Sequence, residues 1–126
     1  MLADTKAFSS FAVDDVEAAK RFYGETLGLK LTVLQEEMGL LSLNLAGGHD
    51  VFVYPKPDFV PATYTVLNFD VDDIDAAVDE LVSRGVVFDR IDGFNQDEKA
   101  IARGNGPNIA WFKDPAGNTL SVLEQP

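Results

Sequence analysis

The feature that most constrains the fold of this chain is an internal repeat. Residues 11–19 (FAVDDVEAA) recur as residues 69–77 (FDVDDIDAA), with six of the nine positions identical and two conservatively changed. Each copy joins a stretch rich in β-branched and aromatic residues to a stretch whose apolar residues recur at helical spacing. The repeat therefore predicts two copies of a strand followed by a helix.

The ends of the two predicted helices carry matching signals. Asp14 and Asp72 are the predicted N-caps, because an aspartate before a helix accepts hydrogen bonds from its first free N–H groups. Gly28 and Gly85 are predicted to end the helices, since glycine commonly follows a helix C-terminus. Both predicted helices thus have residues typical of an N-cap at their start and of a helix C-terminus at their end.

Three strand-like segments follow each predicted helix, so each half is a β-α-β-β-β module. The expected strands after the helices are residues 29–34, 40–45 and 51–54 in the first half and 86–91, 108–113 and 119–123 in the second. Asp114-Pro115-Ala116-Gly117-Asn118 is a strong turn signal before the last strand. Residues 92–107 lack periodicity and are interpreted either as a binding loop or as a disordered crossover.

The predicted fold class is α+β, with two tandem β-α-β-β-β modules in one domain of 126 residues. Module one is expected at residues 1–55, a proline-rich linker at 56–62 and module two at 63–126.

Composition excludes several classes of partner. A net charge of -11 repels phosphate backbones and anionic lipids, so neither nucleic acid nor membrane is expected as a partner. No cysteine is present, no apolar run approaches the roughly 20 residues of a membrane span, and the N-terminus lacks the layout of a secretion signal. The expected location is the cytoplasm, and acidity would favour cationic ligands.

Two motifs carry a resemblance to a known family. Residues 14–29 (DDVEAAKRFYGETLGL) and 111–118 (WFKDPAGN) resemble motifs of the glyoxalase/bleomycin-resistance/dioxygenase superfamily, also called vicinal oxygen chelate proteins. The resemblance covers nearly the whole chain. It implies modules whose mixed sheets curve into cups, and it implies a homodimer whose two chains share their pockets.

The resemblance also allows a test for a metal site. Metal-using members carry His, Glu or Gln ligands at four strand positions, which fall here on Phe8, Phe52, Val66 and Ser121. The first three have no lone pair to donate and a serine hydroxyl is a weak ligand. The single histidine, His49, is expected at a hairpin tip. We therefore expect no metal and no other cofactor.

Strand alternation predicts which residues line the cup. The expected ligand-binding residues are Phe8, Ser10, Phe52, Tyr54, Val66, Asn68, Trp111 and Ser121. They would form a mostly apolar pocket with a few polar anchors, as small-molecule sites generally do. Trp111 could stack on a flat or cationic ligand, or be a core residue. Phe8 and Phe52 could likewise be core residues that fill the cup.

The residues favour binding over catalysis, with no catalytic residue assigned. One histidine and no cysteine exclude Ser-His-Asp and Cys-His arrangements. The favoured function is sequestration of a small aromatic or cationic molecule, in the manner of the bleomycin-resistance members. The alternatives are a glyoxalase/lyase-like or dioxygenase-like enzyme with non-standard metal ligands, and a ligand-free sensor or interaction module.

Overall fold

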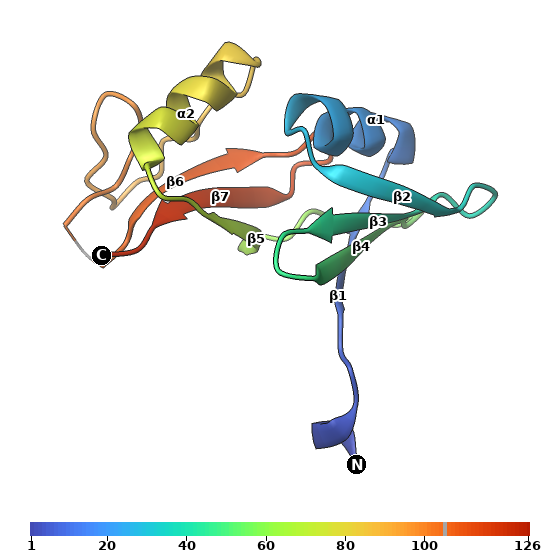
Figure 1. Ribbon diagram of the computed structural model, residues 1–126. Helices are drawn as coiled ribbons and strands as arrows, with labels where there is room; N and C mark the ends of the chain where they lie inside the picture. The colour runs from blue at the N-terminus through green and yellow to red at the C-terminus, as the bar shows by residue number, and fades with distance from the viewer. Residues whose placement is uncertain (105) are drawn as a thin grey trace. The chain divides into compact units, whose positions relative to one another are not determined.

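The computed structural model describes residues 1–104 and 106–126, which form two compact units, Met1–Val60 and Pro61–Pro126. Each unit contains one mixed β-sheet with an α-helix on one of its faces (Figure 1). The α+β class and the modular architecture predicted from the repeat are confirmed.

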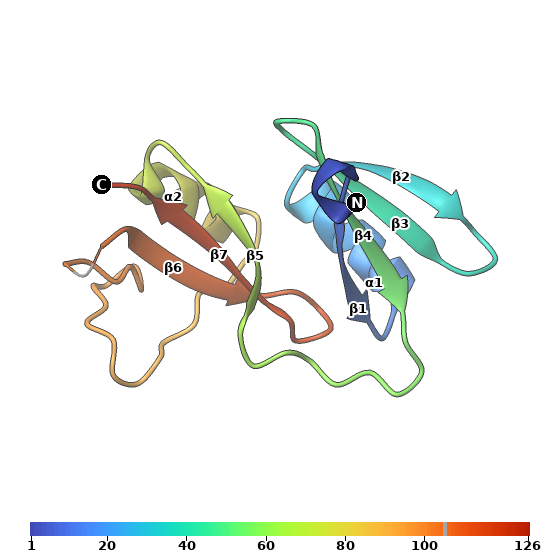
Figure 2. The ribbon, with the colours of Figure 1, turned by 90° about the horizontal axis from the view of Figure 1, so that it is seen from below.

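The first unit contains a four-stranded sheet in the order β1-β4-β3-β2 (Figure 2). After a short 3-10 turn at Leu2–Asp4, its elements are β1 (Ser9–Val13), α1 (Val16–Arg21), a π-helical turn (Phe22–Thr26), β2 (Lys30–Gln35), β3 (Leu40–Leu45) and β4 (His49–Pro55). β1 runs parallel to β4, and the other neighbouring strands are antiparallel. His49, expected at the hairpin tip, is exposed and begins β4.

Alternation along these strands separates an apolar face from a mixed face. The apolar face is buried together with residues of α1 and the turn after it, and the buried set is Phe11, Val13, Ala19, Tyr23, Leu41, Leu43, Val51 and Val53. On the other face Ser10 pairs with Phe52 and Ala12 pairs with Tyr54. Burying one face of each strand leaves the other free to carry polar and aromatic groups.

The second unit contains a three-stranded sheet in the order β5-β7-β6. Its elements are β5 (Thr65–Asp70), α2 (Ile74–Ser83), β6 (Asn108–Lys113) and β7 (Thr119–Glu124). β5 is parallel to β7, and β6 is antiparallel to it. Ile74 and Val78 of α2 are buried, as are Phe112, Leu120 and Val122 of the sheet.

The paired strands show that the two modules are structural repeats. Ser10 pairs with Phe52 across β1 and β4, and Asn68 pairs with Ser121 across β5 and β7. The second module differs by a bulge in β5, where Val66 is the extra residue between Thr65 and Leu67.

One predicted strand, residues 86–91, is wrong. The structure has an isolated bridge there, between Phe88 and Phe112, instead of a fourth strand. The side chain of Gln96 accepts a hydrogen bond from the Ile91 N–H at 2.8 Å and donates one to the Asp89 carbonyl at 2.9 Å. A side chain thus occupies the backbone groups that strand pairing would use.

The predicted N-caps are each wrong by one residue. Asp15 and Asp73 cap the helices, and their carboxylates accept hydrogen bonds from the N–H groups of Ala18 and Ala76 at 3.1 Å. Both caps have extended backbone, as the position before a helix requires. In a doubled aspartate, the second residue stands directly before the first helical turn and takes the cap.

The predicted C-terminal glycines are confirmed. Gly28 follows the π-helical turn with φ of 73°, and Gly85 follows α2 with φ of 94°. These are left-handed conformations that glycine adopts without a steric penalty.

The turn before β7 is fixed by a buried aspartate. Asp114 accepts hydrogen bonds from the N–H groups of Ala116 and Asn118 at 3.0 and 2.9 Å, and from the Asn118 side-chain amide at 3.1 Å. Gly117 has φ of 94°. The predicted turn over residues 114–118 is therefore confirmed, with a physical role for Asp114, Gly117 and Asn118.

The described part of the segment 92–107, which excludes residue 105, is folded back on itself. Asp97 accepts hydrogen bonds from the N–H groups of Lys99 and Ile101, both at 2.9 Å. Bridges join Gln96 to Ala102 and Ala102 to Ile109. None of the helices in the described parts of the chain is long and apolar enough to cross a membrane.

The cap assignment gives a matched test. Asp73→Ala should lower the free energy of unfolding by about 1 kcal/mol, because the Ala76 N–H loses its partner at the helix start. Asp72→Ala, at the exposed neighbouring aspartate, should change it by less than about 0.5 kcal/mol. Urea unfolding of both variants measures the difference. Equal effects at the two positions would contradict the assignment.

Candidate binding pocket

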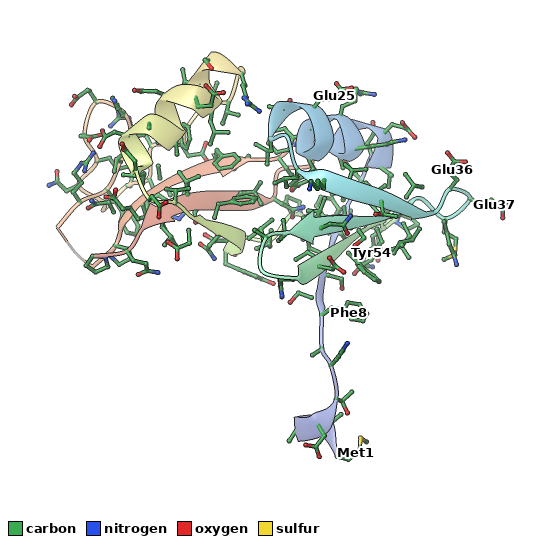
Figure 3. The ribbon with its side chains drawn as sticks, in the orientation of Figure 1. Met1, Phe8, Glu25, Glu36, Glu37 and Tyr54 are labelled. Carbon is green, nitrogen blue, oxygen red and sulfur yellow. The ribbon has the colours of Figure 1, made fainter. Side chains whose placement is uncertain are left out.

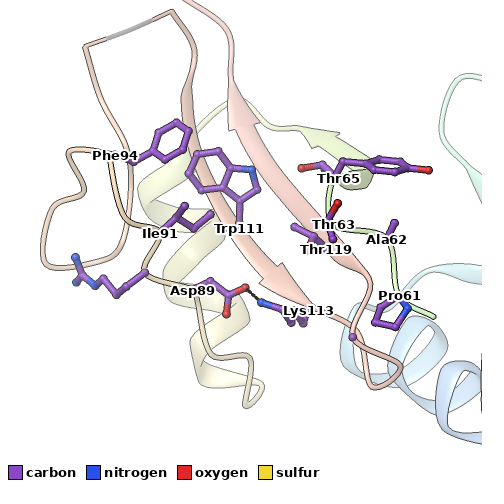
Figure 4. A pocket seen from close by; sticks show the side chains of 13 residues that line it. Pro61, Ala62, Thr63, Thr65, Asp89, Ile91, Phe94, Trp111, Lys113 and Thr119 are labelled. Carbon is purple, nitrogen blue, oxygen red and sulfur yellow. Dashed lines mark hydrogen bonds and ion pairs between the residues drawn. The ribbon is translucent and has the colours of Figure 1, made fainter.

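The second unit carries a pocket of about 620 Å³ on the sheet face opposite α2 (Figure 4). Its lining comes from the segment leading into β5, from residues 89–94, from β6, and from the turn and start of β7. The end of the expected linker contributes to it, since Pro61 and Ala62 line one side.

Strand register explains which sheet residues reach the pocket. One row across the sheet consists of Thr65, Thr119 and Lys113, which are paired through β7. All three line the pocket. Trp111 lies two residues before Lys113 on β6 and therefore points to the same face.

Two aromatic side chains form the most apolar wall. Trp111 and Phe94 have ring centroids 4.9 Å apart with planes tilted by 58°, a favourable arrangement for aromatic rings. Trp111 is 8% exposed and Phe94 is 52% exposed. The tryptophan is therefore both a packed residue and part of the pocket surface, and Phe94 offers an open ring face or edge to a ligand.

Gln96 holds the wall from which Phe94 projects. Besides its bonds to Ile91 and Asp89, its amide donates to the Ala100 carbonyl at 2.8 Å. Ala100 has φ of 65°, a left-handed conformation that costs an alanine roughly 1–2 kcal/mol. Three hydrogen bonds at about 1 kcal/mol each offset that strain. The segment is thus fixed by one polar side chain.

Asp97 and Arg103 tie the same segment to α2. Arg103 contacts both oxygens of Asp75 at 3.0 Å and Asp97 at 3.1 Å. Desolvation alone would raise the pKa of Asp97, but its bonds from the Ile101 N–H, the Arg103 guanidinium and the Lys99 N–H hold that pKa below its usual range. The hydrogen bond from Arg103 is the main cause that lowers the pKa of Asp75.

An ion pair lies in the polar part of the pocket. The Lys113 ammonium is hydrogen-bonded to Asp89, and the side chains are 53% and 27% exposed (Figure 4). Asp89 is held in place, since its N–H donates to the Trp111 carbonyl at 2.8 Å. A charged pair therefore stands beside the aromatic wall.

The residues predicted in module two reach this face to different extents. Trp111 lines the pocket. Ser121 and Asn68 form the adjacent row with Trp111, and the buried Ser121 hydroxyl donates to the Asn68 amide oxygen at 2.5 Å. Val66 lies at the β5 bulge, half-buried, and is not part of the lining.

The residues predicted in module one lie together on the mixed face of the first sheet. Figure 3 shows Phe8 and Tyr54 on the side away from α1. The ring centroids of Phe8 and Phe52 are 4.4 Å apart, and Ser10 pairs with Phe52 across β1 and β4. Phe8 remains 63% exposed, so the Phe8–Phe52 contact leaves much of its ring open to solvent.

Sequence reasoning missed several residues of the pocket in the second unit. They are Pro61, Ala62, Thr63, Tyr64, Thr65, Asp89, Arg90, Ile91, Phe94, Lys113, Gly117 and Thr119. For Lys113 and Thr119 a signal was present, because alternation from Trp111 and Ser121 places both on the same face. No signal marked Asp89 or Phe94 as pocket residues. Asp89 lay in a segment predicted to be a regular strand, and Phe94 lay in a segment without periodicity.

The residues at the four metal-ligand positions of the family do not suit a transition metal. Phe8, Phe52 and Val66 have no donor atom, and the hydroxyl of Ser121 is hydrogen-bonded to Asn68. Within residues 1–104 and 106–126, no three His, Cys, Asp or Glu side chains are grouped closely enough to hold a metal ion.

Solved structures with the same fold cover nearly the whole chain. TnmS3, an antibiotic binding protein from Streptomyces sp. CB03234, is 26% identical over 98% of each chain with a TM-score of 0.72. A glyoxalase/bleomycin resistance protein from the same organism is 28% identical, with 93% of this chain and 99% of that chain covered and a TM-score of 0.64. A glyoxalase family protein from Bacillus anthracis is 23% identical over 97% of each chain, with a TM-score of 0.70.

The comparison with curated proteins found no match. The model of the Glyoxalase/Bleomycin resistance protein/Dioxygenase superfamily matches residues 7–122. That match spans nearly the whole chain, includes both motifs and agrees with the fold. The chain belongs to the glyoxalase/bleomycin resistance protein/dioxygenase superfamily.

Proposed function

We propose that this protein binds a small planar aromatic molecule in the pocket of its second unit and sequesters it without turnover. The observation that carries the proposal is the aromatic wall of Trp111 and Phe94, which stands beside the polar row of Lys113, Thr119 and Thr65. Small-molecule sites combine apolar and aromatic walls with a few placed polar groups in this way. The pocket volume of about 620 Å³ is within the usual range for such ligands.

Similarity to an antibiotic binding protein supports the proposal. TnmS3 shares 26% identity over 98% of both chains. A fold can host unrelated chemistries, so the pocket residues carry the argument and the likeness adds weight to it. The unsuitable donor set at the four family positions also favours binding over metal-dependent catalysis.

The pocket lining favours an aromatic ligand over a cationic one. Arg90 and Lys113 line it, and Asp89 is already paired with Lys113. The net charge of -11 would attract a cation from a distance. The described lining of the pocket, however, contains no unpaired carboxylate that could bind the cation. Stacking of the ligand on the aromatic wall is therefore expected to contribute more to the binding free energy than attraction between the pocket and a cationic ligand.

Phe94 provides the cleanest test, because Trp111 is too buried to truncate without loss of packing. Phe94→Ala should weaken binding of the neutral planar probe acridone about two- to twelvefold, through loss of an aromatic contact worth about 0.5–1.5 kcal/mol. Fluorescence titration measures the dissociation constant. Phe59→Ala, in the first unit and outside this pocket, is the control and should leave it unchanged. Unchanged affinity in Phe94→Ala would remove this wall from the site.

Gln96 should act on binding by positioning the wall. Gln96→Leu removes the three hydrogen bonds to Ile91, Asp89 and Ala100, so amide hydrogen exchange at residues 89–91 should rise and acridone affinity should fall. We expect a loss of about 2 kcal/mol in local stability. Gln35→Leu, at an exposed position of β2, is the matched control. Faster exchange with unchanged affinity would show that the wall is not needed for binding.

The expected homodimer stays a prediction. Analytical ultracentrifugation should give twice the chain mass of 13.7 kDa. A single species at the mass of one chain would contradict it.

A further inference from the structure

We propose that the pocket prefers planar aromatic molecules that carry a carboxylate, and that Lys113 determines this preference. The inference rests on the proposed function, because it names the ligand class for the same pocket. It is carried by the balance of donors and acceptors around the aromatic wall.

Lys113 is placed where it can reach a ligand stacked on that wall. It lies two residues after Trp111 on the same strand and face, and both line the pocket. Its row continues through the hydroxyls of Thr119 and Thr65. With neighbouring strands about 4.8 Å apart, this polar row spans about 10 Å, enough to run along one side of a two-ring aromatic molecule.

The donors in this row exceed the acceptors available to them. An ammonium has three N–H donors, and one of those of Lys113 is taken by Asp89. The Lys113 side chain is 53% exposed, so its other donors are accessible. Asp89 is the one carboxylate among the described lining residues, and it is the partner of that lysine.

An added acceptor from the ligand would complete this arrangement. A carboxylate could accept from the ammonium beside Asp89 and from a threonine hydroxyl. A ligand ammonium would instead approach Lys113 and Arg90, with its nearest lining carboxylate already engaged. The net charge of -11 opposes an anion, but salt screens charges beyond about 8 Å under physiological conditions. Direct contact with Lys113 is expected to outweigh that repulsion.

Three naphthalene probes separate the charge preference from stacking. We would measure dissociation constants for 2-naphthoate, 2-naphthamide and 2-naphthylmethylammonium by calorimetry on the full chain. The carboxylate should bind about tenfold tighter than the ammonium, with the amide between them. Lys113→Met should weaken naphthoate about tenfold and change naphthamide by less than about twofold. Lys6→Met, at an exposed position outside the pocket, should leave all three constants unchanged.

Two further variants keep the test sharp if Lys113→Met disturbs the fold by leaving Asp89 unpaired. Asp89→Asn should tighten naphthoate, because it releases an ammonium donor and removes a negative charge. Lys113→Met combined with Asp89→Asn removes both charges of the pair and should abolish the preference for naphthoate over naphthamide.

The failures of the two proposals are distinguishable. If naphthamide binds and naphthoate binds no tighter, the charge preference is overturned and the aromatic pocket stands. If Lys113→Met weakens all three probes equally, Lys113 has a structural role and the inference also fails. If none of the probes binds, the proposed function itself is contradicted for this pocket.

Discussion

Burial of an apolar face against a helix in each sheet is the constraint from which the rest of the structure follows. Phe11 and Val13 in β1, and Leu120 and Val122 in β7, are buried on faces that also receive an α-helix. Since side chains alternate along a strand, that burial commits every second residue to the opposite face. A one-residue slip would exchange the two sets, so the core also fixes what the other face can present.

The repeat predicted the fold well because it encodes this constraint twice. Its register is visible in the pairs Ser10–Phe52 and Asn68–Ser121, which occupy equivalent places in the two sheets. The errors arose where local chemistry competes with periodicity. In each doubled aspartate the first residue was predicted as the cap and the second takes the position, a difference of one residue that a hydrophobic pattern does not resolve.

The candidate site was less predictable for a physical reason. Trp111 lies on a predicted strand, which leaves its side chain a choice of two faces, whereas Phe94 lies in a segment without a period. That segment is shaped by Gln96, whose side chain replaces a neighbouring strand as the partner of the Asp89 carbonyl and the Ile91 N–H. A glutamine in an aperiodic stretch gives no sign of such a role, because its partners are backbone groups that every residue possesses.

This replacement has a functional consequence. A fourth strand in the second unit would commit the Asp89 carbonyl and the Ile91 N–H to a ladder, and alternation would turn neighbouring side chains to opposite faces. In the observed segment, the consecutive residues Asp89, Arg90 and Ile91 all line the same pocket as Trp111, and Phe94 joins them. The departure from the β-α-β-β-β pattern therefore supplies the wall that three regular strands lack. Gln96, whose hydrogen bonds hold this wall in place, is therefore expected to affect binding without contacting the ligand.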